Sequence, residues 1–171
     1  FSGSQQAHTL QALIEISSLY SSFFIKLGKN FRTELGGRYN DHNVYGTNLT
    51  YTINPSYLIA DKYKLFINFS SAYKVPSLYQ LFSVYGNINL KPESTRTFEF
   101  GADMDIAEKI RLNWAYFNRT IQDVIGFGSN FTYINSDRQK DHGFELELNA
   151  KPSTKTQVDA FYAYVYGRIY K

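Results

Sequence analysis

The sequence predicts an all-β protein whose antiparallel strands follow one another in up-and-down order. Apolar and polar residues alternate with a period of two over most of the chain, and helical patterning is nearly absent. Aromatic residues make up 18% of the 171 residues, with 15 Tyr and 14 Phe, and aromatic side chains favour pleated surfaces. Short connections alternate with longer ones along the chain, as they do in a series of hairpins.

The individual strands are predicted from the side chains that alternate along them. Segment 15–26 gives the weakest signal, and segment 64–75 is among the clearest. In the latter, Leu65, Ile67 and Phe69 point to one face, while Asn68 and Lys74 point to the other. The same alternation predicts strands at 31–40, 47–59, 95–106, 110–120, 142–150 and 158–166. We therefore expect eight strands in four hairpins.

The connections differ in length between the two ends of the predicted sheet. Short turns are expected at 27–30, 60–62, 107–109 and 151–154, and longer loops at 41–46, 76–92 and roughly 126–141. This asymmetry is typical of outer-membrane barrels, which have short periplasmic turns and long outer loops. Strands of about ten residues are also long enough to cross a membrane at a tilt.

The two faces of the predicted strands favour a transmembrane barrel over a soluble sandwich. Tyrosines lie near the turns and loops on the apolar face, as in an interfacial aromatic girdle. The opposite face carries charges that a wide barrel would place in a wet lumen. The residues expected to face the lumen are Arg38, Glu99, Arg111, Arg119, Glu145 and Glu147. A soluble β-sheet binding protein, a complete eight-stranded barrel and an outer-membrane enzyme remain as alternatives.

Composition and motifs give no support for catalysis. The net charge of +3 is too balanced to indicate nucleic-acid binding. The absence of Cys excludes disulfides, thiol catalysis and iron–sulfur clusters. No HExxH, GxSxG or P-loop pattern occurs, and the stretch 126–131 (GFGSNF) lacks the third glycine of a dinucleotide fingerprint. We expect no enzyme activity, no metal site and no cofactor.

The long connection 76–92 is unusually apolar for a loop and is the candidate binding segment. We expect Tyr79, Phe82, Tyr85 and Asn87 to face a ligand. Aromatic rings give contact area at low entropic cost, and an amide gives hydrogen bonds. The alternative is that these side chains only pack the loop against its neighbours.

Four stretches carry a resemblance to a known family. Residues 73–82 read YKVPSLYQLF and residues 85–93 read YGNINLKPE; 38–46 reads RYNDHNVYG, and 143–147 reads GFELE. These stretches resemble the TonB-dependent receptors of the Gram-negative outer membrane, and their order and spacing look most like the cobalamin transporter branch. Siderophore and haem receptors share much of the pattern.

The resemblance implies a 22-stranded barrel filled by an N-terminal plug. Residues 1–171 would then be a partial barrel domain from its C-terminal half, with about eight strands and without the plug and the C-terminal strand. The implied function is import of a scarce nutrient by a multi-pass protein of the outer membrane. The cobalamin branch implies cobalamin or a related corrinoid as the nutrient, with a siderophore or haem as the alternative. The implied partners are the TonB–ExbB–ExbD complex, membrane lipid and a surface lipoprotein, with no nucleic acid.

Overall fold

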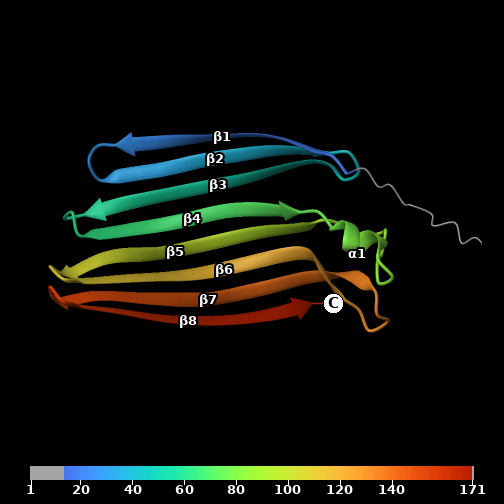
Figure 1. Ribbon diagram of the computed structural model, residues 1–171. Helices are drawn as coiled ribbons and strands as arrows, with labels where there is room; N and C mark the ends of the chain where they lie inside the picture. The colour runs from blue at the N-terminus through green and yellow to red at the C-terminus, as the bar shows by residue number, and fades with distance from the viewer. Residues whose placement is uncertain (1–13, 171) are drawn as a thin grey trace, which may run out of the picture.

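The computed structural model describes residues 14–170 as one antiparallel sheet of eight strands in the order β1 to β8. Figure 1 shows these strands side by side, with a short helix, α1, at one end. The prediction of an all-β, up-and-down chain is confirmed. The elements are β1 Ile16–Leu27, β2 Phe31–His42, β3 Gly46–Ile59, β4 Tyr63–Lys74, α1 Leu78–Phe82, β5 Glu93–Ala107, β6 Ile110–Phe127, β7 Tyr133–Ser153 and β8 Thr156–Tyr170.

The β1–β2, β3–β4, β5–β6 and β7–β8 turns lie at one end of the sheet, called the turn end here, and the other three connections lie at the opposite end, the loop end (Figure 1). Two predicted loops were too long. The connection expected at 41–46 is only the three residues between His42 and Gly46. The loop expected at 126–141 is only 128–132, because β6 continues to Phe127 and β7 already begins at Tyr133.

The error at 126–141 has a physical cause. Strands β6 and β7 are 18 and 21 residues long, which is more than the roughly 9–11 residues that a membrane crossing needs. Their loop ends therefore extend beyond the apolar layer, where both faces meet water and polar residues suffice on both. A positive φ of 53° at Asp123 also interrupts the regular alternation there. The alternation of apolar and polar residues is lost there, although β6 and β7 stay paired as far as Phe127 and Tyr133.

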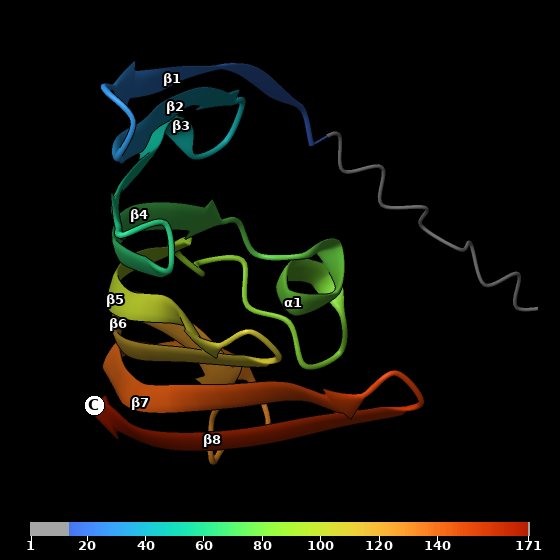
Figure 2. The same ribbon diagram turned by 90° about the vertical axis from the view of Figure 1, so that its left-hand side faces the viewer.

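The sheet is curved, and its two faces differ in polarity. Seen along the strands, it forms an arc with α1 on the concave side (Figure 2). A hollow of about 360 Å³ is lined by side chains from β1 to β5, including Glu34, Asn54, Lys64 and Glu99. Only a concave face can enclose a hollow across five strands, so the polar face is the concave one. The apolar face is convex and exposed, as at Leu65 and Phe69.

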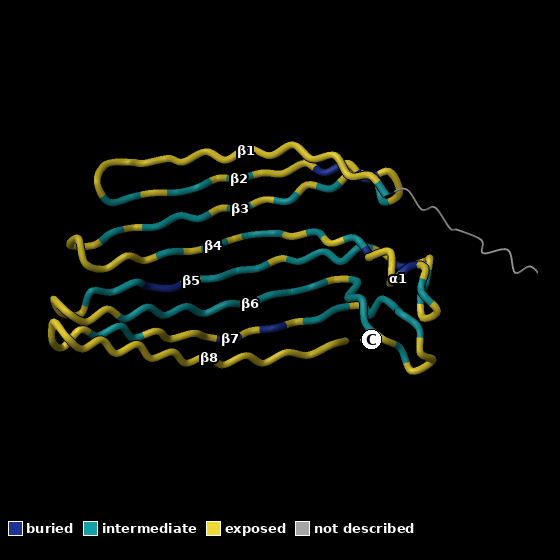
Figure 3. Tube along the Cα trace, viewed as in Figure 1, coloured by how far each residue is buried: buried dark blue, intermediate teal, exposed yellow. Residues whose placement is uncertain are grey.

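Very little of the chain is buried, and the colouring in Figure 3 shows mostly exposed and intermediate residues. The buried hydrophobic side chains of residues 14–170 are Leu81, Leu90 and Ala102. No second layer covers either face of the described sheet, and within it β1 and β8 pair on one side only. A packed sandwich and a closed eight-stranded barrel are therefore both excluded. No helix within residues 14–170 is long and apolar enough to cross a membrane.

Candidate functional site

The connection between β4 and β5 is an ordered structure built around α1. Ser77 caps the helix, because its hydroxyl accepts from the Gln80 backbone N–H at 3.2 Å and the Gln80 side chain accepts from the Ser77 N–H at 2.9 Å. Pro76, Leu81 and Leu90, which belong to the loop itself, are buried. A Cβ at Gly86 would lie 2.5 Å from the Leu81 carbonyl oxygen, so the fold of the loop requires glycine at this position.

This loop is attached to the β6–β7 hairpin by hydrogen bonds. The Asn87 side-chain amide donates to the Tyr133 carbonyl at 3.0 Å, and the Tyr133 N–H donates to the Tyr85 carbonyl at 2.9 Å. Asn135 accepts from the Lys91 N–H at 2.8 Å and donates to the Lys91 carbonyl at 3.0 Å and the Asp123 carbonyl at 2.6 Å. The loop therefore holds a fixed position against the end of the hairpin.

A group of aromatic rings, exposed except for the half-buried Tyr133, lies where the loop meets the hairpin. We call it the loop patch: Tyr79, Tyr85, Phe127, Phe131 and Tyr133. Its rings contact one another mostly edge to face, with centroid separations from 5.3 to 6.3 Å. Exposure reaches 59% at Tyr79 and 71% at Phe131. So much exposed aromatic surface, fixed in place, is a suitable surface for stacking a ligand.

The four residues expected to face a ligand fall into two kinds. Tyr79, Phe82 and Tyr85 are exposed, at 59%, 44% and 42%. The Asn87 amide is instead used within the protein, because it donates to Tyr133 and accepts from the Asn89 N–H at 2.9 Å. Sequence reasoning missed Phe127, Phe131 and Tyr133, although the aromatic stretch 126–133 contained the signal.

The β2–β3 connection lies at the same end of the sheet. His42 is 2% exposed, and its Nδ1 accepts from the N–H groups of Val44 at 3.0 Å and Tyr45 at 3.2 Å. Its ring lies 5.0 Å from that of Tyr45, and burial raises the pKa of the Tyr45 phenol. Within the described residues His42 therefore has a structural role, and the stretch 38–46 is shaped by this turn.

The six residues predicted to face a lumen all occupy one face of the sheet. In the strand register, Arg38, Glu99, Arg111, Arg119, Glu145 and Glu147 share the parity of the polar, concave face. Arg119 donates from Nε at 2.9 Å and from Nη2 at 2.6 Å to Oδ2 of Asp141, whose side chain is 3% exposed. The Gln139 amide satisfies the other Asp141 oxygen at 2.8 Å.

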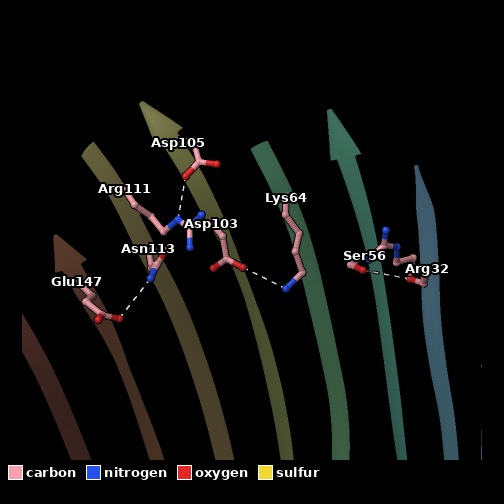
Figure 4. A network of polar contacts seen from close by, with 8 residues as sticks. All are labelled: Arg32, Ser56, Lys64, Asp103, Asp105, Arg111, Asn113 and Glu147. Carbon is pink, nitrogen blue, oxygen red and sulfur yellow. Dashed lines mark hydrogen bonds and ion pairs between the residues drawn. The ribbon is translucent and has the colours of Figure 1, made fainter. Parts of the chain in front are cut away.

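Near the turn end, the concave face carries a row of polar contacts across several strands (Figure 4). Lys64 pairs with Asp103 at 3.1 Å and Arg111 with Asp105 at 2.8 Å. Asn113 donates to Glu147 at 3.3 Å. Such pairs are exposed and contribute little to stability, but they give the concave face a hydrated, charge-balanced surface. Residues 14–170 contain no cluster of acidic or histidine side chains suited to a metal ion.

Known proteins match this fold over nearly its whole length. The model of the family described as TonB dependent receptor-like, beta-barrel matches residues 4–171. The siderophore receptor PirA from Pseudomonas aeruginosa superposes with a TM-score of 0.83 at 23% identity, over 90% of this chain and 32% of that protein. A mutant of the ferric enterobactin receptor PfeA from Pseudomonas aeruginosa gives 0.78 at 20% identity, over 89% and 26%. The iron transporter FrpB from Neisseria meningitidis gives 0.76 at 18% identity, over 91% and 25%.

The chain thus spans about a quarter to a third of the length of these solved structures. Their names do not support the cobalamin branch that the sequence order and spacing suggested. The prediction of a receptor barrel rather than an enzyme agrees with the family match. The chain belongs to the TonB-dependent receptor family and forms part of its β-barrel in the bacterial outer membrane.

Proposed function

We propose that this chain is a section of an active transporter that imports an iron–siderophore complex across the outer membrane. The observation that carries the proposal is the loop patch, an exposed aromatic surface at the loop end of the barrel wall. Loops of outer-membrane barrels at this end face the outside of the cell. A ligand arriving from outside would meet the patch before it reached the concave face.

The chemistry of the patch supports a siderophore more than a corrinoid. Aromatic rings such as Tyr79 and Phe131 offer faces and edges to planar groups, and catechol rings of siderophores are planar and aromatic. A corrinoid carries many amides at its rim and would need matching hydrogen-bond partners. The Asn87 amide, which could have supplied them, is already bonded to Tyr133. The siderophore and iron transporters among the similar folds point the same way.

The concave face supports passage rather than chemistry. Its charges are paired across strands, as in Lys64–Asp103 and Arg119–Asp141, and the face has the hydrated character of a barrel lumen. Family membership implies that a plug fills this lumen and that the TonB–ExbB–ExbD complex supplies the energy for uptake. A surface lipoprotein that caps the loops is a further partner of the same proposal.

The proposal is tested by equilibrium binding to the full-length receptor that contains these residues. Ferric enterobactin serves as the catecholate probe and cyanocobalamin as the corrinoid probe. We expect saturable binding of ferric enterobactin, weakened about 10-fold to 100-fold in the double variant Tyr79→Ala, Phe131→Ala by the loss of two aromatic contacts.

The matched control is Val44→Ala, an exposed apolar position at 64% exposure that lies in the other loop and outside the loop patch. It should bind as the unmodified receptor does. Saturable cobalamin binding, without binding of ferric enterobactin, would return the assignment to the corrinoid branch. Equal weakening by the control and the double variant would remove the loop patch as the binding surface.

A further inference from the structure

A second charged surface lies on the convex face, at the loop end of β5 to β8. We call it the basic patch, and it consists of Arg96, Arg138, Lys140 and Arg168. In the strand register, Arg96 pairs with Thr120, Thr120 with Lys140, and Lys140 with Arg168. At about 4.8 Å between strands this row is about 14 Å long. Arg138 lies one step nearer the loops on the same face, beside the Tyr170 ring at 5.3 Å.

The basic patch lies among the aromatic residues at the loop-end edge of the apolar surface on the convex face. On β5, Arg96 follows Phe98 toward the loops, and on β8, Arg168 follows Tyr166. The Tyr166 ring contacts His142 at 5.4 Å, and Lys140 lies one step beyond His142. Aromatic residues of this kind mark the edge of the hydrocarbon layer in outer-membrane barrels. The patch therefore lies at the height of the lipid headgroups on the outer side.

The cations of the basic patch have no carboxylate partners within residues 14–170. The ion pairs of that region involve other cations, Lys64, Lys74, Arg111 and Arg119, and their partners lie on the concave face. The outward-facing positions of the β5–β8 ladder hold no Asp or Glu. Lys140 and Arg168 lie directly opposite each other, and like charges in that position destabilise a sheet. An external anion would remove this repulsion.

We propose that the basic patch binds the phosphate groups of lipid headgroups in the outer leaflet of the outer membrane. Arginine guanidinium groups match phosphate oxygens with two parallel N–H donors. The patch is positively charged, lies at the height of the headgroups and faces outward from the barrel wall. The proposal depends on the membrane location of the family, and it is independent of the substrate that the transporter carries.

The test measures how much lipid the full-length receptor retains in detergent, by native mass spectrometry. The probe is diphosphoryl lipid A, a phosphorylated glycolipid of bacterial outer leaflets, and the reference is the same glycolipid stripped of both phosphates. We expect the receptor to prefer the phosphorylated form. In the triple variant Arg96→Gln, Lys140→Gln, Arg168→Gln the affinity for it should fall about 100-fold, given the contribution of each basic residue near a charged membrane surface.

The matched control removes three lysines at the turn end, Lys62→Gln, Lys109→Gln and Lys155→Gln, so that the net charge changes equally. This control should retain lipid A as the unmodified receptor does. The charge-preserving variant Arg96→Lys, Lys140→Arg, Arg168→Lys should stay within a few-fold. If the triple glutamine variant does not fold, as seen by loss of heat-modifiable gel mobility, Lys140→Gln alone is measured and should weaken binding about 5-fold.

Three results would overturn the proposal. The triple or single variant could retain as much lipid A as the unmodified receptor. Both triple variants could lose lipid equally, which would reduce the effect to net charge. Inorganic phosphate at millimolar concentration could displace the lipid completely, which would identify a site for a free anion. Loss of siderophore binding in the same samples would not bear on the basic patch, so the two proposals fail separately.

Discussion

Glycines on the concave face let neighbouring strands approach closely beneath aromatic side chains. A Cβ at Gly143 would meet the Tyr164 carbonyl oxygen and would lie 2.8 Å from Cζ of Phe117. Gly101 is placed in the same way, because its Cβ would lie 2.7 Å from Cζ of Phe66. An aromatic ring that covers a cross-strand glycine stabilises a curved sheet. This explains the glycine of the stretch 143–147, which the sequence alone showed only as part of a family resemblance.

Replacing Gly143 by Ala should destabilise the receptor by about 2 kcal/mol, because a packed backbone has to shift to admit the methyl group. The matched control is Gly37→Ala, in a strand position where a Cβ meets nothing within 4 Å. That control should be neutral or slightly stabilising, since Ala loses less entropy than Gly on folding. Urea unfolding of the full-length receptor in detergent measures both. Equal effects at the two positions would contradict the crowding at Gly143.

At this scale, the sequence indicated the candidate loop better than the bonds that its side chains form. Tyr79 was predicted to face a ligand; its ring is exposed, and its role in binding stays a prediction. The Asn87 amide was predicted to face a ligand, but its bond to Tyr133 joins residues 46 positions apart. No local pattern reports such a contact. Phe127 belongs to an aromatic stretch that the sequence shows, but its contact with Tyr85 joins two connections far apart in the chain, which no local pattern reports.

At the scale of elements, Asn135 on β7 fastens the long loop to the β6–β7 hairpin. It bonds both backbone groups of Lys91 and also the Asp123 carbonyl. Asn135 therefore fixes the position of the loop patch relative to the concave face. The sequence predicted the loop between β4 and β5 but not α1, because a five-residue helix is too short to show periodicity.

Asn135→Ala should loosen the loop without unfolding the sheet. Three hydrogen bonds are lost, each contributing about 1 kcal/mol, so the amides of Gly86, Asn87 and Leu90 should exchange with solvent about 100-fold faster. Asn130→Ala is the matched control, because within residues 14–170 the one hydrogen bond of its side chain is accepted from the Thr132 hydroxyl, at the tip of the hairpin. Hydrogen exchange read by mass spectrometry compares the two. Unchanged exchange in Asn135→Ala would show that the loop is held by other contacts.

At the scale of the whole molecule, aromatic residues mark the loop-end edge of the apolar band on the convex face. On β2 the last aromatic residue toward the loops is Tyr39 and on β8 it is Tyr170, and the strand register relates these two positions. Between them, on β5 and β7, the basic patch takes the place of the aromatic residues, with Arg96 beyond Phe98 and Lys140 beyond His142. The basic patch therefore lies within the edge that the aromatic residues define.

The parity of the two faces was predictable inside the lipid layer, because a strand between lipid and water must alternate. The extent of a strand could be predicted only where the strand lies in the lipid layer, because only there must apolar and polar residues alternate. Above that layer β6 and β7 continue without this alternation, and the predicted loop 126–141 was wrong for this reason. The position of the basic patch and the closing of the loop onto the hairpin depend on strand register, which single strands do not encode.

The central claim is that the convex face meets lipid and the concave face meets water. Single cysteines carrying spin labels test it most directly, and the chain itself contains no cysteine to interfere. In the full-length receptor in lipid vesicles, labels at Ile67 and Phe69 should collide with oxygen dissolved in lipid, and labels at Asn68 and Ser70 with a water-soluble nickel reagent. A period of two in this accessibility is the predicted result. Equal access of the nickel reagent to all four positions would contradict the account.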